Sequence, residues 1–307
     1  MSGLRQALDD YLTLRRSAGF KLDQAGQTLS GFLKYLEQRG EMRITASLAL
    51  QWATSPAGAL PCTWAIRLGH VRRFATYLQH FDPRTEVPAS DLVVYRRQRR
   101  APYIYSDEDV NGLLRAAMAL PGSLLRPTYA TLFGLLAVTG MRVGEATNLD
   151  RADVDVEQGL LTIRKAKFGK SREIPLHAST VGALRAYART RNRLLRCPPT
   201  ATFFASRNGS RLKHQNVDAT FLRLVRVAGL WERKPHRPRI HDLRHTFAVR
   251  TLTDWYREGL DVVPRLPTLS TYLGHVGPSS TYWYLTATPA LLALANERAE
   301  RSVEICS

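Results

Sequence analysis

The chain has 307 residues, of which 44% are hydrophobic and 23% charged, and these values exclude a disordered chain, a collagen and a coiled-coil rod. It carries 44 Lys and Arg residues against 26 Asp and Glu residues, so its formal net charge is +18. A protein this basic usually binds a polyanion, with nucleic acid the first candidate and a membrane surface the second. Residues 1–102 and the remainder are both basic, as in a clamp that grips a duplex from two sides, although a solvated arginine-rich surface would have the same charge.

Cysteine content and the N-terminal residues bear on the expected location. Three widely spaced cysteines without a Cys-x-x-Cys motif make a disulfide framework and a structural zinc site unexpected, and they favour a reducing, cytoplasmic setting. The first ten residues contain acids and no apolar run, so we expect no signal peptide. No apolar stretch approaches 18 residues, so we expect no membrane-spanning helix.

Residues 1–82 predict a helical domain. Apolar residues recur at helical spacing around residues 4–12, 29–36, 48–52 and 63–80. We therefore predict a four-helix DNA-binding domain. One side of its last helix is basic, and we expect that side to contact DNA through Arg67, Arg72 and Arg73.

Residues 83–105 predict an extended basic linker between two domains. Three prolines prevent a continuous helix, and neighbouring arginines repel one another. A plain surface loop is the alternative, but the density of arginine favours contact with phosphates. The arginines expected to make that contact are Arg96, Arg97, Arg99 and Arg100.

Residues 106–307 predict a second domain that is mainly helical with a small antiparallel β-sheet. Ser106 is a candidate N-cap with Asp109 at the capping-box position, and a core helix from Tyr129 to Thr139 should end at Gly140. Two short strands, joined by a hairpin tip, are expected at 160–164 and 172–175. Further helices are expected at about 142, 179–195, 215–228, 241–256, 267–273, 279–285 and 289–301.

Two charged residues directly follow the predicted core helix, at a place where packing alone does not require charged side chains. Arg142 comes directly after the glycine turn, and a guanidinium at such a place needs an anion or a carboxylate partner. Glu145 lies three residues later on the same helical face and could orient Arg142. A simple structural pair between the two is the alternative.

Residues in two further segments could handle protons or a phosphate group. Lys167 in the hairpin could reach a ligand as a proton donor, although taken alone an exposed lysine is the simpler interpretation. His241 and Arg244 share a helical face, which suits a phosphate oxygen. His241 and His245 also have zinc-protease spacing, but Asp242 stands where that motif has glutamate, and Arg244 would lie close to the cation.

A candidate nucleophile lies near the C-terminus. Tyr284 follows His275 by nine residues, and a tyrosine in an arginine-rich site can attack phosphorus. Tyr282 is a rival, but on a helix it would point about 200° away from Tyr284. Trp283 between them is expected to pack in the core.

Taken together, the order and spacing of these motifs resemble the tyrosine recombinase (phage integrase) family. The resemblance covers about residues 103–295 and rests on motifs at 139–145, 167–176, 241–245, 273–275 and 284. It implies an N-terminal core-binding domain and a C-terminal integrase-like catalytic domain that together form a C-shaped DNA clamp. It also implies a site-specific DNA recombinase for integration, excision or transposition of a mobile element, or a similar process.

The resemblance also implies a role for each motif residue. Tyr284 would attack the scissile phosphate and form a 3′-phosphotyrosyl link, while Arg142 and Arg244 would clamp the phosphate oxygens. Lys167 would protonate the departing 5′-oxygen. His241 would exchange a proton, most naturally that of the tyrosine.

Other residues would support this chemistry or face the DNA. His275 would hydrogen-bond the phosphate, and Glu145 would hold the arginine. Near the hairpin and the histidines, the residues expected to bind DNA are Lys165, Lys170, Arg172 and His245. Lys165 and Lys170 are also rivals of Lys167 for the role of proton donor, but counting back from Ile174 favours Lys167.

The implied partner is double-stranded DNA with specific recombination sites. On DNA the protein would form a homotetramer or a mixed recombinase tetramer. Without DNA it would be a monomer or a weak oligomer. No metal, no other cofactor and no membrane partner is expected, and the expected location is the cytoplasm, at the nucleoid. The helix from about residue 289 would dock on a neighbouring protomer or on its own domain.

Four alternatives remain at this point. A type IB topoisomerase-like enzyme would relax DNA by similar chemistry without choosing a site, and an accessory protein of the same fold would bind DNA without cleaving it. A zinc hydrolase would use His241 and His245. A basic membrane-surface protein has no amphipathic lysine-rich segment to support it.

Overall fold

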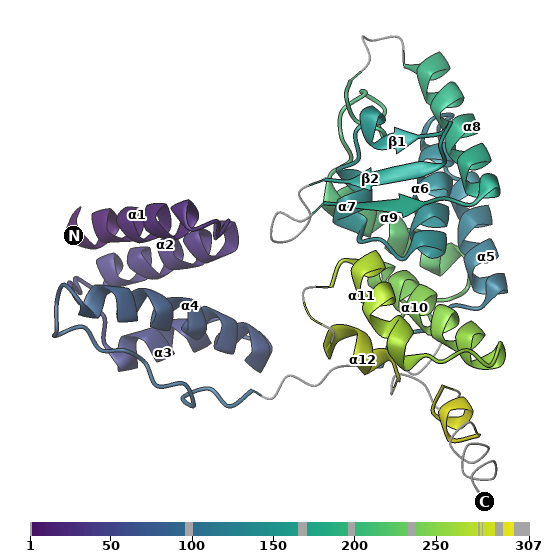
Figure 1. The fold of residues 1–307 in the computed structure, drawn as a ribbon. Coiled ribbons are helices and arrows are strands. Elements are labelled where there is room, and N and C mark those ends of the chain that lie inside the picture. Colours follow the sequence, from purple (N-terminus) through teal and green to yellow (C-terminus); the bar gives the residue numbers. More distant parts are fainter. Residues whose placement is uncertain are drawn as a thin grey trace, which may run out of the picture. The chain divides into compact units, whose positions relative to one another are not determined.

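The computed structural model describes residues 2–95, 101–164, 171–195, 200–232, 237–275, 277, 279–285 and 291–297. The chain divides into two compact units, Met1–Arg99 and Arg100–Ser307 (Figure 1). The division falls within the predicted linker of residues 83–105. The expected fold class, mainly helical with a small antiparallel sheet, is confirmed.

The first unit consists of four helices whose apolar faces meet in one core. They are α1 (Ser2–Ser17), α2 (Asp23–Gln38), α3 (Ala46–Thr54) and α4 (Pro61–Gln79), which confirms the four predicted helical segments. Phe32 and Phe74 are completely buried in this core. The Thr45 side chain caps α3, and Pro61 begins α4, where the absence of an N–H costs nothing.

The second unit combines the helices α5 to α12, a further helical segment at 291–297 and a small sheet. The helices are α5 (Asp107–Met118), α6 (Leu125–Thr139), α7 (Val143–Thr147), α8 (Ala178–Leu194), α9 (His214–Val227), α10 (Ile240–Arg257), α11 (Leu266–Leu273) and α12 (Ser279–Leu285). Two 3₁₀ turns lie at Arg151–Asp153 and Val263–Arg265. The predicted capping box is present, because the Ser106 side chain accepts from the Asp109 N–H and the Asp109 carboxylate accepts from the Ser106 N–H.

The sheet is antiparallel with the strand order β1-β2-β3. Strand β1 (Val154–Asp155) pairs with β2 (Leu160–Ile163), and β2 pairs with β3 (Arg172–Pro175) in a register that places Leu161 opposite Ile174. Both predicted strands are confirmed. Strand β1 was not predicted, since two residues are too few to show an alternating pattern.

Helix α6 is the central helix of the second unit. Its residues Leu132, Phe133 and Leu136 are almost completely buried, which confirms the predicted core helix, and it packs against α5, α8 and α10. It ends at Gly140, which has a φ of 60°. A Cβ on Gly140 would lie 2.6 Å from the Phe247 ring, so this position requires glycine for both its backbone conformation and the close packing of α10.

Helices α10, α11 and α12 pack together through a separate apolar cluster (Figure 1). Leu252, Leu269 and Tyr284 belong to this cluster, and so does Leu291. Within the described residues, no helix is both long and apolar enough to cross a membrane.

Candidate active site

The site is built around the C-terminal ends of two helices. Helix α6 ends at Gly140 and α11 ends at Gly274, and both glycines adopt the left-handed conformation, with φ values of 60° and 66°. The last carbonyl groups of a helix lack partners within the helix and carry partial negative charge. Arginine side chains from other elements bind these carbonyl groups.

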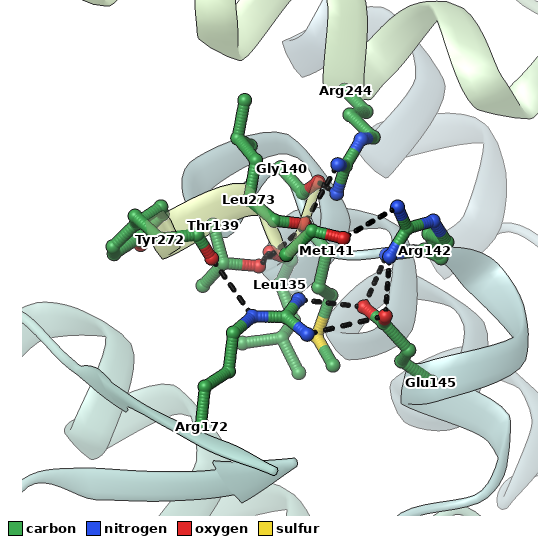
Figure 2. A network of polar contacts seen from close by, with 11 residues as sticks. Leu135, Thr139, Gly140, Met141, Arg142, Glu145, Arg172, Arg244, Tyr272 and Leu273 are labelled. Carbon is green, nitrogen blue, oxygen red and sulfur yellow. Dashed lines mark hydrogen bonds and ion pairs between the residues drawn. The ribbon is translucent and has the colours of Figure 1, made fainter. Parts of the chain in front are cut away.

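Arg244 and Arg142 meet at the end of α11. Arg244, on α10, donates from Nη1 to the Gly140 carbonyl at 2.8 Å and from Nη2 to the Leu273 carbonyl at 2.7 Å. Arg142, at the N-terminus of α7, donates from Nη2 to the Gly274 carbonyl at 2.9 Å. Figure 2 shows both guanidiniums directed toward this helix end. The two guanidiniums therefore bind the same helix end.

Glu145 lies between two arginines and holds both. Its carboxylate accepts from Arg142 Nη1 at 2.8 Å and from the Arg142 backbone N–H at 3.0 Å. Arg172, at the start of β3, donates to the same carboxylate at 2.8 and 3.3 Å and to the Tyr272 carbonyl at 2.8 Å (Figure 2). Burial acts to raise the pKa of Glu145, but the bonds from Arg172 and Arg142 outweigh it, so the pKa is lowered and the group is a carboxylate at pH 7.

Positive charge exceeds negative charge in this network. Two guanidiniums, those of Arg142 and Arg172, share the Glu145 carboxylate, whereas the bonds of Arg244 go to backbone carbonyls and the residue is only 2% exposed. Burial, followed by the charge of Arg142, lowers the pKa of Arg244 to about 10. A guanidinium has five N–H donors, and the bonds given above use two on Arg142 and two on Arg244. The arrangement therefore favours an additional anion at the two arginines.

Two histidines border the arginines. His241 is exposed at the start of α10, yet partial burial of its imidazole, followed by the charge of Arg244, lowers its pKa to about 4. His275 bonds through Nδ1 to the Thr281 hydroxyl at 2.7 Å. Burial, followed by the charges of Arg244 and Arg142, lowers the pKa of His275 to about 4. Both imidazoles are neutral at pH 7, so each has one donor and one acceptor nitrogen.

Tyr284 lies on α12 beside these histidines. The residue is 2% exposed, and its hydroxyl lies 3.1 Å from Nδ1 of His245. The His275 ring is nearly parallel to the tyrosine ring, at 20°, with 6.1 Å between the ring centroids. Burial, followed by the proximity of His241, lowers the pKa of His245 to about 3. His245 is therefore neutral, and with its proton on Nε2 it accepts a hydrogen bond from the tyrosine hydroxyl.

Comparison with known proteins identifies the family of the chain. The model of the phage integrase family matches residues 105–290. The chain belongs to the phage integrase family of tyrosine recombinases. The resemblance inferred from the motifs is confirmed.

Related sequences carry corresponding names. A protein of Sinorhizobium fredii (strain NBRC 101917 / NGR234) named "Putative integrase/recombinase y4rB" is 46% identical over 311 residues, with 99% of each chain covered. Tyrosine recombinase XerD of Vibrio cholerae is 29% identical over 244 residues, covering 79% of this chain and 76% of XerD.

Solved structures share the fold. The Tn1549 transposon integrase in complex with transposon right end DNA aligns with a TM-score of 0.69 and 17% identity, covering 97% of this recombinase and 98% of that chain. The XerH site-specific recombinase in its post-cleavage complex with a palindromic difH substrate aligns with a TM-score of 0.67 and 20% identity. The alignment covers 95% of this chain and 84% of the XerH chain.

The structure brings together the motif residues that it describes. Arg142, Arg244, His241, His275 and Tyr284 surround one end of α11, with Glu145 beside them. Lys165, Lys167 and Lys170, and the linker residues Arg96, Arg97, Arg99 and Arg100, lie outside the described residues. Among the described residues, no group of three or more His, Cys, Asp and Glu side chains could hold a metal ion.

Three arginines of this recombinase that were expected to face DNA bond to protein groups. The Arg172 side chain is 10% exposed because it pairs with Glu145. Arg67 donates to the Trp52 carbonyl at 2.7 Å and stacks on the Trp52 ring at 3.8 Å. Arg72 donates at 2.7 and 2.6 Å to two carbonyls of the segment that follows α4. Arg73, by contrast, is exposed.

Sequence reasoning missed two contacts in the site. The pairing of Arg172 with Glu145 joins residues that are remote in the chain, and no local pattern indicates it. The contact of His245 with Tyr284 had a weak signal, since His245 lies one helical turn after His241 and so shares its face of α10. Expected to face DNA, His245 contacts the candidate nucleophile.

Proposed function

We propose that this tyrosine recombinase cleaves and rejoins DNA at specific sites through a covalent link between Tyr284 and a 3′-phosphate. One observation carries the proposal: Arg142 and Arg244 bind neighbouring carbonyl groups at the end of α11, and His275, which follows that end, lies against Tyr284. A phosphate bound by both arginines would therefore lie close to a tyrosine hydroxyl. The names of the similar proteins support this function.

The two arginines would stabilise the transition state more than the ground state. Negative charge on the equatorial oxygens of phosphorus grows as the fifth bond forms, and guanidiniums already fixed by carbonyl groups need no reorganisation to meet it. Losing one such donor costs on the order of 10²–10³ in rate. Arg244 is the more tightly fixed of the two, since two backbone carbonyls hold it.

In the proposed reaction, the Tyr284 oxygen bonds to the scissile phosphorus while the bond from phosphorus to the 5′-oxygen breaks. A phenol with a pKa near 10 is a weak nucleophile at pH 7, so the positive field of the arginines must favour its ionised form. Lys167, which lies outside the described residues, would give the proton to the departing 5′-oxygen. His241 would accept and return the tyrosine proton.

The covalent link keeps the energy of the broken phosphodiester bond. A 5′-hydroxyl from the same or another duplex can therefore attack the link and restore a DNA strand without ATP. Because the arginines supply positive charge to the phosphate, the proposed reaction also requires no metal ion. We propose that both basic units contact the duplex and that four protomers assemble on two paired sites. The reaction would integrate, excise or transpose a mobile element.

A suicide substrate tests this proposal. Duplexes from the DNA that flanks the gene are nicked close to the cleavage position, so that the short 5′-hydroxyl fragment diffuses away and the protein stays attached to the 3′-phosphate. The wild-type chain should form a DNA adduct that resists denaturant and maps to Tyr284. Tyr284→Phe should form none, whereas Tyr282→Phe, which changes a 47% exposed neighbour, should react normally. An adduct in the Tyr284→Phe variant would refute the proposal.

A further inference from the structure

The Tyr284 hydroxyl has a specific neighbour on α10. The hydroxyl lies 3.1 Å from Nδ1 of His245, with the two rings tilted by 59° and 5.5 Å between their centroids. We propose that His245 is a positioning residue, which orients the Tyr284 hydroxyl for attack on the scissile phosphate. This inference rests on the proposed function.

The His245 ring is fixed from two sides. The Trp283 ring meets it edge-on with 5.3 Å between centroids, and the His241 ring meets it edge-on at 4.7 Å and 87°. Trp283 also contacts Tyr284, again at 5.3 Å, so the three rings of His245, Trp283 and Tyr284 touch one another. An acceptor nitrogen at a constrained position can set the direction of a hydroxyl group better than a mobile side chain can.

The hydroxyl needs such an acceptor because it is buried. Tyr284 is 2% exposed and lies in the apolar cluster of α10 and α11, where water does not surround the phenol. The C–O bond of a phenol rotates readily, so the hydrogen bond decides where its hydrogen and its lone pairs point. Directing the hydrogen to Nδ1 of His245 therefore fixes the direction from which the oxygen can attack phosphorus.

His245 acts as an acceptor rather than as a strong base. Its pKa of about 3 lies far below that of a phenol, near 10, so full proton transfer from Tyr284 is strongly unfavourable before DNA binds. The same low pKa keeps Nδ1 unprotonated at pH 7, so it can accept.

Two substitutions separate acceptance of the hydrogen bond from ring packing. His245→Asn places an amide oxygen close to the position of Nδ1, whereas His245→Phe keeps the aromatic ring and has no acceptor. We expect adduct formation under single-turnover conditions, with saturating suicide substrate, to be ~10²-fold slower in the Phe variant. The Asn variant should remain within about fivefold of the wild type, since a correctly placed acceptor preserves the geometry. DNA affinity should be unchanged in both, because His245 contacts the tyrosine and not the proposed phosphate site.

A second substrate locates the defect within the reaction. Replacing the bridging 5′-oxygen by sulfur gives a leaving group that needs no proton, so it compensates for a lost proton donor but not for a misdirected nucleophile. The His245→Phe defect should persist on this substrate. The inference is overturned if the Phe variant cleaves at the wild-type rate, if the Asn variant is as slow as the Phe variant while melting at the wild-type temperature, or if sulfur restores the Phe variant.

The proposed function can fail separately from this inference. If the wild type forms no adduct, or if Tyr284→Phe still forms one, the nucleophile is misassigned and both proposals fall. If the wild type forms its adduct at Tyr284 while the two His245 variants behave alike, the recombinase assignment stands and only the role of His245 is refuted.

Discussion

Arg244 and Arg142 donate to successive carbonyl groups of the same helix end, those of Leu273 at 2.7 Å and Gly274 at 2.9 Å. One turn of backbone therefore sets the spacing between two side chains that come from different parts of the chain. Any change that moves this turn should move both guanidiniums together. Substitution of Gly274, where the turn bends, tests this relationship most directly.

Gly274→Ala should reduce cleavage strongly. Gly274 has a φ of 66°, and an added Cβ would lie 2.7 Å from Nη1 of Arg172 and 2.9 Å from its Cζ. The methyl group must displace Arg172 from Glu145 or shift the turn that Arg142 and Arg244 bind. We expect a fall of roughly 10²-fold in the adduct rate, since small displacements at a reacting centre have effects of this size.

A matched glycine controls for backbone strain. Gly229 has a φ of 68° and no atom within 4 Å of an added Cβ, so Gly229→Ala carries the same left-handed cost of about 1–2 kcal/mol without a collision. Both variants should be destabilised to denaturant, but Gly229→Ala should keep its cleavage rate. Equal rates in the two variants would show that the α11 turn does not set the arginines.

Glu145→Gln should destabilise the second unit. The substitution removes the negative charge between Arg142 and Arg172 while nearly preserving volume, and the carboxylate side chain is only 8% exposed. Breaking a buried ion pair by neutralising one partner costs about 3 kcal/mol. Urea unfolding should show this loss, and the adduct rate should fall as Arg142 loses its support.

An exposed ion pair provides the comparison for Glu145. Glu157 pairs with Arg185 at 3.0 Å, but its side chain is 82% exposed. Glu157→Gln should change the free energy of unfolding by less than about 0.5 kcal/mol, since solvent screens exposed pairs. If both Gln variants unfold at the same urea concentration as the wild type, Glu145 does not hold the arginines.

Arg72 and Arg73 are adjacent on α4 but should respond differently to substitution. Arg72 donates to the Pro88 and Ala89 carbonyls, whereas Arg73 is exposed. Arg72→Met should lower the melting temperature of the first unit and leave the salt dependence of DNA affinity unchanged. Arg73→Met should reduce the slope of log affinity against log salt by about 0.9, the value for one lost phosphate contact. A reduced slope in Arg72→Met would instead assign Arg72 to DNA.

The histidines should make the fold sensitive to acid. Burial, followed by the proximity of His241, lowers the pKa of His245 from 6.5 to about 3, so between these pH values the unfolded chain binds more protons than the folded one. Stability from this group is complete above pH 6.5 and falls as the pH decreases. From pH 7 to pH 5 the loss reaches about 2 kcal/mol. His245→Asn cannot titrate, so its melting temperature should fall less over the same interval, and equal falls would contradict the low pKa.

Much of the fold could be predicted because its signals are local. Local signals predicted each helix from α1 to α12. Apolar periodicity indicated those of the first unit, and Gly140 and Ser106 marked helix boundaries, since capping and termination depend on neighbouring backbone groups. The bond between Arg142 and Glu145 was also predictable, because three residues span one helical turn. Strand β1 escaped prediction because it consists of two residues.

Composition and motif order were enough to identify the family and name the candidate catalytic residues, because both depend only on residue type and on spacing along the sequence. Tertiary structure alone decided which carbonyl groups the arginines bind, that Arg172 pairs with Glu145, and that His245 lies at the Tyr284 hydroxyl. These contacts join remote segments, and they form because the packing of α6, α10, α11 and α12 brings two helix ends and one tyrosine together. Local periodicity indicates which face of a helix is buried, but it does not indicate which other element covers that face.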